Sequence, residues 1–258
     1  MISVWKGWSR VKGSLSASRR VLLILDFDGT LSPLAETPDA AVLPLVIRQT
    51  LRRLTALPSV TVAIMSGRPV TYLRRMVGDR RVIYGGNHGL EMRGPRLSFI
   101  HSEARRLRTT VRAYASAWRS TLNLIPGALL ENKGLSLGLH HRRVPARHLP
   151  AFHRLIDRLK RQTAGRPFRW RTGKKVWELL PDVAWNKGKA ALWLMKKMKD
   201  PRPVVVGDDV TDEDMFRALR RRGTCIVVGR KRSAAGLYLA GQGEVPRLLR
   251  SLEKELSA

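Results

Sequence analysis

Short runs of apolar residues, each ended by a polar or glycine-rich turn, recur along the chain and predict buried β-strands. Val21–Leu25 is the clearest run, with five aliphatic residues in succession, and similar runs occupy Val60–Met65, residues 82–84, residues 203–206 and Thr224–Val228. Strands without polar alternation are typical of parallel sheets that helices cover on both faces. The pattern therefore predicts an α/β fold with Thr224–Val228 as its last strand.

Other segments show the periodicity of amphipathic helices. Residues 45–56 carry apolar side chains at near-helical spacing, and they follow a proline-containing loop over residues 32–44. Residues 189–197 and a closing segment over residues 248–256 also predict helices. The basic residues 1–18 predict a loose arm or a first helix turn, to which the pattern assigns no function.

The region from residue 103 to residue 181 repeats one helix followed by two short strands. Such an αββαββ unit is a small sheet with two helices on one face, and its position between core segments predicts an inserted α+β cap domain. We expect a basic N-terminal arm over 1–18, a core over 19–102 and 182–258, and the cap over 103–181. The predicted helices are 103–122 and 149–162, and the predicted strands are 128–132, 135–140, 168–171 and 175–180.

Composition is that of a folded protein, but the charge is unusual. Of 258 residues, 43% are hydrophobic, whereas 49 Lys and Arg against 20 Asp and Glu give a net charge of +29. Such a field favours anionic partners, yet no nucleic-acid module is visible, so we expect no specific nucleic-acid binding. No apolar run reaches the ~20 residues that a membrane span needs, and no secretory signal is apparent. We therefore expect a cytoplasmic monomer without membrane contact, in which the single cysteine, Cys225, is a buried packing residue.

Charged residues gather directly after the predicted strands. Asp26 and Asp28 follow the first strand, and Gly29 lets the backbone turn sharply beside them. Ligands of open α/β sheets bind at this carboxyl edge. Two neighbouring carboxylates repel each other unless a cation compensates, which favours a hard divalent ion such as Mg²⁺. A plain strand followed by an Asp-Gly turn is the alternative.

The next two strands deliver further polar groups to the same edge. Ser66, Gly67 and Arg68 follow the second strand, where Ser66 has the chemistry to donate a hydrogen bond to a phosphoryl oxygen. The third strand leads into a glycine-rich turn that carries Asn87 and His88, which is typical of a backbone that approaches a ligand. An ordinary helix cap and a glycine-rich hairpin are the structural alternatives.

The C-terminal part adds a lysine and a concentration of acids. Lys187 stands near a predicted helix start, an unfavourable place for a cation unless it faces anions. Residues 208–214 then hold a dense acidic run after the predicted strand 203–206, which argues for a bound cation. Solvated charges at helix ends are the alternative for both features.

In order, these motifs resemble those of haloacid dehalogenase-type (HAD) phosphohydrolases. The matching segments are Asp26-Phe27-Asp28-Gly29-Thr30-Leu31, Ser66-Gly67-Arg68, Lys187 and the run from Asp208. The resemblance implies a HAD-like Rossmannoid core, an Asp26 nucleophile, an Asp28 general acid/base, and phosphoryl contacts from Ser66 and Lys187. It further implies Mg²⁺ held by Asp26, Asp208 and the backbone carbonyl of Asp28, with Asp212 and, more weakly, Asp209 orienting these ligands.

The segment Gly86-Asn87-His88-Gly89-Leu90-Glu91 resembles a signature of trehalose-6-phosphate phosphatases, and two cap segments resemble the cap motifs of that family. The resemblance implies a Mg²⁺-dependent phosphatase that acts on trehalose 6-phosphate. The substrate-binding residues it implies are Gly67, Arg68, Asn87, His88, Glu131, Lys133, Arg142, Lys174 and Glu178. Alternatives are a HAD phosphatase for sucrose 6-phosphate or mannosyl-3-phosphoglycerate, and a non-catalytic basic binding module.

Overall fold

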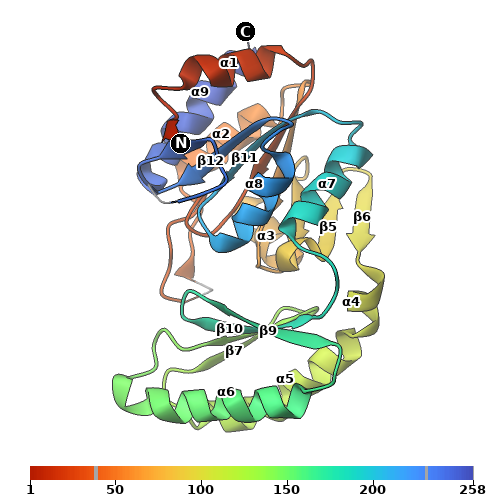
Figure 1. The fold of residues 1–258 in the computed structure, drawn as a ribbon, viewed down its shortest axis with the longest axis vertical. Helices are drawn as coiled ribbons and strands as arrows, with labels where there is room; N and C mark the ends of the chain where they lie inside the picture. Colours follow the sequence, from red (N-terminus) through yellow and green to blue (C-terminus); the bar gives the residue numbers. More distant parts are fainter. Residues whose placement is uncertain (38–39, 230–231, 258) are drawn as a thin grey trace. The chain divides into compact units, whose positions relative to one another are not determined.

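The computed structural model describes residues 1–37, 40–229 and 232–257, and these divide into two compact units (Figure 1). The first unit takes in Met1–Ala35 and residues 40–99 and 185–257. The second unit takes in Ile100–Ala184, together with residues 36 and 37. The prediction was an inserted cap over 103–181; the inserted part of the second unit extends over residues 100–184, and its role as a cap stays a prediction.

The first unit is built on a mostly parallel sheet, in which the described residues form nine strands in the order β1-β13-β12-β11-β2-β3-β4-β5-β6. Pairing is parallel from β1 through β4, whereas β5 runs antiparallel to β4. The strands are β1 (Ile2–Ser3), β2 (Val21–Leu25), β3 (Val60–Met65), β4 (Ile83–Gly86), β5 (Glu91–Gly94), β6 (Leu97–Ile100), β11 (Arg202–Gly207), β12 (Thr224–Val228) and β13 (Leu237–Leu239). The predicted α/β class with a mostly parallel sheet is confirmed.

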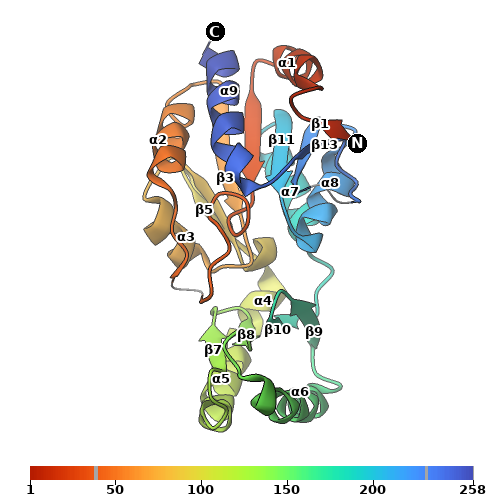
Figure 2. The same ribbon diagram turned by 90° about the vertical axis from the view of Figure 1, so that its left-hand side faces the viewer.

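Helices cover both faces of this sheet, as the uninterrupted apolar strands require. In β2, Leu23 and Leu25 belong to one apolar core and Leu22 and Ile24 to the other, because successive side chains of a strand point to opposite faces. Figure 2 shows α2 and α3 on one side of the sheet and α7 and α8 on the other. The helices of this unit are α1 (Trp8–Ser16), α2 (Leu45–Leu54), α3 (Val70–Val77), α7 (Lys187–Lys197), α8 (Glu213–Leu219) and α9 (Val245–Ser257).

Two expectations for this unit need correction. The predicted loose arm over residues 1–18 belongs to the first unit: β1 pairs with β13, and Val11 of α1 is fully buried. Thr224–Val228 is not the last strand, because Leu237–Leu239 follows it as β13. The sheet also extends through β5 and β6, two strands of four residues that the sequence pattern did not predict.

The second unit has the predicted order of helices and strands. Helices α4 (Ser102–Arg106) and α5 (Arg108–Asn123) replace the single predicted helix, and α6 (Leu149–Thr163) follows the first strand pair. The four strands pair antiparallel in the order β7-β8-β10-β9. These strands are β7 (Leu129–Asn132), β8 (Leu137–His140), β9 (Phe168–Gly173) and β10 (Val176–Pro181). Side chains of α5, α6 and all four strands share one apolar core, so the helices cover one face of this sheet.

No helix in the described parts of the chain is both long enough and apolar enough to cross a bilayer. This finding agrees with the absence of a long apolar run in the sequence.

Candidate active site

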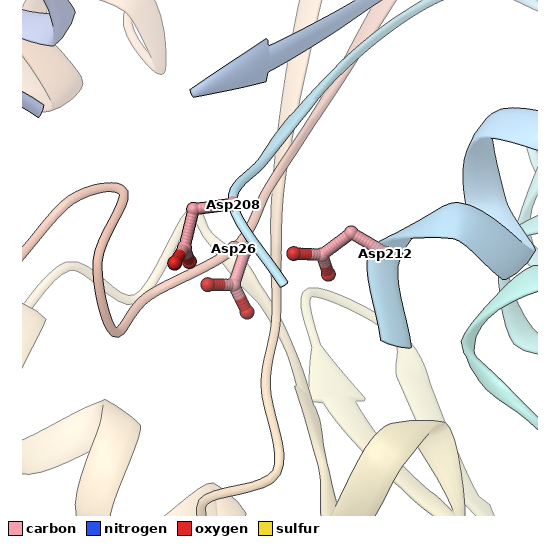
Figure 3. Close-up of side chains that lie close together, drawn as sticks. All are labelled: Asp26, Asp208 and Asp212. Carbon is pink, nitrogen blue, oxygen red and sulfur yellow. The ribbon is translucent and has the colours of Figure 1, made fainter. Parts of the chain in front are cut away.

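The first unit brings three aspartates together at the carboxyl edge of its sheet. Asp26 follows β2 and Asp208 follows β11, and the two strands are parallel neighbours. The backbone N–H of Asp26 donates to Val206 O at 2.9 Å, which continues the ladder to the end of the strands. Carboxylate oxygens of Asp26, Asp208 and Asp212 lie within 4.8 Å of one another, and Figure 3 shows the three side chains converging.

Lys187 joins two of these aspartates from the first turn of α7. Its Nζ donates to Asp26 Oδ1 at 2.7 Å and to Asp212 Oδ1 at 2.8 Å. Only 2% of Lys187 is exposed, so these two ion pairs are shielded from water. Asn186 caps the helix by accepting a hydrogen bond from the backbone N–H of Lys189, which fixes the start of α7.

Burial and neighbouring charges shift the pKa values of Asp26 and Lys187. Burial is the largest influence on Asp26 and raises its pKa well above the usual range, and the charges of Asp212 and Asp208 raise it further against the opposing effect of Lys187. Burial alone would lower the pKa of Lys187, but the charges and hydrogen bonds of Asp212 and Asp26 outweigh burial and raise it. The lysine therefore stays protonated, and the ionised form of Asp26 is disfavoured.

The donor set of this cluster fits a hard divalent cation. Carboxylate oxygens are preferred ligands of Mg²⁺, and one lysine cannot balance three carboxylates. A Cβ added at Gly29 (φ 85°) would lie 2.5 Å from Asp208 Oδ2, so glycine is what lets the Asp208 carboxylate rest against the backbone after β2. Asp212 accepts from Lys187 at Oδ1 and from the backbone N–H of Asp209 at Oδ2, so its two oxygens are already engaged. The residues that fit a metal best are therefore Asp26 and Asp208.

Asp28 lies outside the cluster of three and is bound by Arg68 instead. The guanidinium donates from Nε to Asp28 Oδ2 at 2.9 Å and from Nη2 to Oδ1 at 2.6 Å. Arg68 also lies over the ring of Tyr72, with its Cζ 4.6 Å from the ring centroid. Arg68, which the sequence predicts as a substrate ligand, therefore has a second role in the structure, because it fixes the orientation of the Asp28 carboxylate.

Ser66 and the glycine-rich turn lie at the ends of β3 and β4. Ser66 is buried, and its Oγ accepts from the backbone N–H of Arg68 at 3.2 Å. Gly67 packs against the imidazole of His88, where a Cβ would approach Cε1 to 2.5 Å.

Asn87 is fully buried and donates from Nδ2 to Glu91 Oε1 at 2.8 Å. Both Asn87 (φ 49°) and His88 (φ 58°) adopt the left-handed conformation, which marks a turn held by its surroundings.

Glu91 was not among the predicted site residues, although it stands in the same motif. Its Oε1 also accepts from the backbone N–H of Val70 at 3.0 Å, so one carboxylate ties the turn after β4 to the start of α3. Asn87 therefore has a structural role in addition to any contact with a ligand. The signal in the sequence that could have identified Glu91 is its position four residues after Asn87 in the same glycine-rich segment.

The second unit holds a separate cluster of charged side chains. Lys133 Nζ donates to Glu178 Oε1 at 2.6 Å, and Arg171 Nη2 donates to Glu178 Oε2 at 2.6 Å. Glu131 Oε2 lies 2.8 Å from His140 Nε2 and 4.0 Å from Lys133 Nζ. Lys133 and Glu178 are both buried, so the structure brings together three of the predicted residues, Glu131, Lys133 and Glu178.

A glycine makes room for this cluster. In the sheet, Gly138 on β8 is the register partner of both Glu131 and Glu178. Leu137 and Leu139 point into the helix-covered core, so Gly138 lies on the other face of the strand. A Cβ there would approach His140 Nε2 to 3.1 Å. The charged cluster thus occupies the sheet face opposite α5 and α6.

Arg171 and His140 were missed by sequence reasoning, and two predicted residues lie outside this cluster. Arg171 is the register partner of Glu178 on β9, but a register between strands cannot be read from either strand alone. Arg142 and Lys174 are exposed, and Arg142 donates to the backbone oxygen of Lys174 at 3.2 Å. Their predicted contact with substrate stays a prediction.

Comparison with known proteins places the chain in a family. A family model described as Trehalose-phosphatase matches residues 24–240. The chain is 34% identical over 266 residues to a probable trehalose-phosphate phosphatase 9 of Oryza sativa subsp. japonica, with 91% of this chain and 70% of the relative covered. It is 33% identical to trehalose-phosphate phosphatase B of Arabidopsis thaliana, over 80% of this chain and 58% of that protein. The chain thus spans only part of the length of these relatives.

The fold has close counterparts among solved structures. The C-terminal domain of a C. albicans trehalose-6-phosphate phosphatase superposes with a TM-score of 0.78 at 22% identity, covering 95% of this chain and 96% of that one. The match at this identity concerns the fold alone, and it confirms the predicted HAD-like class. Because the family model extends from the strand before Asp26 to beyond the acidic run at Asp208, the chain belongs to the trehalose-phosphatase family.

Proposed function

We propose that this protein hydrolyses trehalose 6-phosphate to trehalose and phosphate in a Mg²⁺-dependent reaction. The observation that carries the proposal is the buried bridge from Lys187 to Asp26 and Asp212, set beside Asp208 at the carboxyl edge of the sheet. In a member of the trehalose-phosphatase family, this arrangement has the charge and the nucleophile that phosphoryl transfer requires.

Asp26 is the proposed nucleophile. Lys187 engages Oδ1, which leaves Oδ2 to attack phosphorus. A bond forms between Asp26 Oδ2 and phosphorus while the bond from phosphorus to the sugar oxygen breaks, giving an aspartyl phosphate. Lys187 supplies fixed positive charge beside the phosphoryl oxygens, and Ser66 contributes a hydroxyl to the same edge. Because these groups are held before the substrate arrives, little reorganisation is needed in the transition state.

Asp28 is the proposed general acid and base. It gives a proton to the departing sugar oxygen, and then it takes a proton from the water that attacks the aspartyl phosphate and releases phosphate. The two contacts from Arg68 keep its carboxylate in one orientation between these steps. Mg²⁺, held by Asp26, Asp208 and the backbone carbonyl of Asp28, would neutralise phosphoryl charge when bound.

Recognition of the disaccharide is assigned to the second unit. Glu131, Lys133 and Glu178 offer charged hydrogen-bonding groups, and their mutual contacts hold them rigid. Fixed donors and acceptors of this kind suit the hydroxyl groups of a neutral sugar. A site built in this way also rejects analogues without those hydroxyl groups, because its buried polar groups would then have no partner. Substrate contacts of His88 and Asn87 stay predictions.

A panel of sugar phosphates tests the substrate. Release of inorganic phosphate is measured with trehalose 6-phosphate, sucrose 6-phosphate, mannosyl-3-phosphoglycerate and glucose 6-phosphate, each with Mg²⁺ and with EDTA. We expect trehalose 6-phosphate to give the highest kcat/KM and EDTA to abolish turnover. Equal turnover of glucose 6-phosphate would remove the disaccharide assignment, and a preference for either of the other two substrates would replace it.

The non-catalytic alternative is tested in the same assay. A basic binding module would release no phosphate from any member of the panel. Family membership and the intact cluster of Asp26, Asp208 and Lys187 favour the enzyme over this alternative.

A further inference from the structure

A second cavity lies in the first unit, at the edge of the sheet opposite the aspartates. Its volume is about 820 Å³, within the ~300 to 1,000 Å³ of ordinary small-molecule pockets. Arg202, Thr224 and Leu237, which begin β11, β12 and β13, line the cavity. Asp208 follows the other end of β11, so the length of that strand, ~20 Å for six residues, separates the two sites.

Four arginines gather around this cavity. Arg10 comes from α1, Arg202 from the start of β11, and Arg220 and Arg221 from the turn after α8. In the described parts of the chain no carboxylate lines the cavity or forms an ion pair with any of the four. The neighbouring Arg222 shows the contrast, because its Nη1 lies 3.5 Å from Asp200 Oδ1.

The rest of the wall is partly apolar and partly hydroxylic. Ser14 and Thr224 contribute hydroxyl groups, and Ser14 Oγ already accepts from Arg202 Nε at 3.0 Å. That bond fixes the guanidinium with its remaining N–H groups available for other acceptors. Ala234, which is partly exposed, and Leu237 give the cavity an apolar side.

The chemistry of the wall identifies the class of ligand. Arginines bind phosphate groups through paired N–H donors, and several in one hollow match several phosphates. The cavity is larger than a chain of phosphates would fill, and its apolar side would have no contact with phosphate groups. Both features favour a ligand that also has an organic part. We propose that this cavity is a binding site for an organic polyphosphate of nucleotide size, separate from the active site.

The proposal also gives residues 1–18 a function that the sequence did not predict. Helix α1 supplies Arg10 and Ser14 to the cavity, and it is held there by β1, which pairs with β13. Without this N-terminal segment the cavity would lose one wall and one of its four arginines.

Isothermal titration calorimetry with the full chain tests the site. ATP, tripolyphosphate and inorganic phosphate are titrated in turn at ~150 mM NaCl, where diffuse attraction to a basic surface is screened beyond ~8 Å. EDTA is present so that no metal draws these anions to the aspartates. We expect one ATP per chain, weaker binding of tripolyphosphate and still weaker binding of phosphate. Equal affinity for ATP and tripolyphosphate would remove the organic part of the proposal.

Two pairs of substitutions separate a built site from the general charge of the protein. Arg10→Ala with Arg221→Ala removes two charges from the cavity, and Arg154→Ala with Arg161→Ala removes two from the exposed face of α6. The cavity pair should weaken ATP binding at least ~10-fold, the size expected for losing a hydrogen bond to a charged group, and the α6 pair less than ~2-fold. Equal weakening by both pairs, or no ATP binding at millimolar concentration, would overturn the proposal.

Gly13→Glu provides a second test that does not remove any existing contact. A Cβ at Gly13 meets no atom within 4 Å, and replacing glycine within a helix favours folding. The new carboxylate would stand in the wall of the cavity and repel phosphates. Ser16→Glu, on the same helix but outside the cavity wall, is the matched control. Retained ATP binding in Gly13→Glu, with a melting temperature no lower than that of the original protein, would contradict the site.

Discussion

The two units each bury a cluster of charged residues, but the clusters differ in their balance of charge. In the first unit, the carboxylates of Asp26, Asp208 and Asp212 converge, and the ammonium of Lys187 contacts Asp26 and Asp212. In the second unit, Glu131 and Glu178 face the cations of Lys133 and Arg171, and His140 adds a further hydrogen bond. One cluster therefore carries excess negative charge, whereas the other is neutralised by its own side chains.

This difference shows which chemistry each cluster supports. Excess negative charge in a buried place is unfavourable unless a cation binds, so we expect the first cluster to bind a metal ion. That metal ion and Lys187 would then compensate the negative charge of a phosphoryl group. A balanced cluster has no such need, and its directed donors and acceptors suit neutral hydroxyl groups. The following predictions test this contrast, from the largest expected effect to the smallest.

Asp26→Asn removes the proposed nucleophile without changing the size of the side chain. We expect kcat to fall at least ~1,000-fold, as for other essential nucleophiles, with trehalose 6-phosphate and Mg²⁺ in a phosphate-release assay. Asp157→Asn, on the exposed surface of α6, is the control and should keep full activity. Turnover above one tenth of the original rate in Asp26→Asn would show that another group attacks phosphorus.

Lys187→Met removes the cation that binds Asp26 and Asp212. Loss of a fixed donor to phosphoryl oxygens should lower kcat about 100-fold. The uncompensated carboxylates should also cost about 3 to 5 kcal/mol of unfolding free energy without metal, measured by urea denaturation. Lys189→Met, exposed on the same helix, should change neither quantity. If Lys187→Met unfolds at the same urea concentration as the original protein, the ion pairs contribute nothing.

Glu178→Gln tests the balanced cluster. It weakens the contacts to Lys133 and Arg171 and leaves the side chains of the acidic cluster in the first unit unchanged. We expect KM for trehalose 6-phosphate to rise about 10-fold, the effect of one hydrogen bond to a charged group, with kcat changed much less. Glu103→Gln, exposed on α4, serves as control. A fall in kcat as large as that of Lys187→Met would mean that both clusters serve the chemical step.

The pH dependence of stability gives the smallest effect. Burial raises the pKa of Asp26 above its ordinary value of 3.8, so the folded protein holds a proton that the unfolded chain has released. In EDTA, the free energy of unfolding should therefore fall as pH rises above 3.8 toward the raised pKa of Asp26. Asp26→Asn should lose this part of the pH dependence and melt a few degrees higher at neutral pH. If the melting temperatures of both proteins changed with pH by the same amount across this range, the raised pKa of Asp26 would be contradicted.

Much of the fold and the acidic site could be predicted because the relevant signals are local. Uninterrupted apolar strands indicated the parallel sheet, and the edge rule placed Asp26 and Asp208 together before any contact was known. Family resemblance then supplied the proposed roles of Asp28 and Ser66, which local chemistry alone leaves open.

The parts that escaped prediction depend on pairing between distant segments. Leu237–Leu239 is too short to stand out, and it is a strand only because β12 and β1 pair with it. Arg171 joins Glu178 through the register of two strands, and the basic cavity needs α1 to meet the start of β11. None of these arrangements can be predicted from a single segment of the sequence.

The contact between Asp26 and Lys187 spans 161 positions along the chain, with the whole second unit between them. During synthesis on a ribosome, Asp26, the proposed nucleophile, therefore emerges long before Lys187, and Asp208 emerges later still. A nascent chain that stops before β11 lacks the middle of its own sheet, because β2 and β11 are neighbours. Phosphatase activity should thus arise only once the chain has been made beyond β11 and Asp208, and truncation before β11 should eliminate it rather than reduce it by degrees.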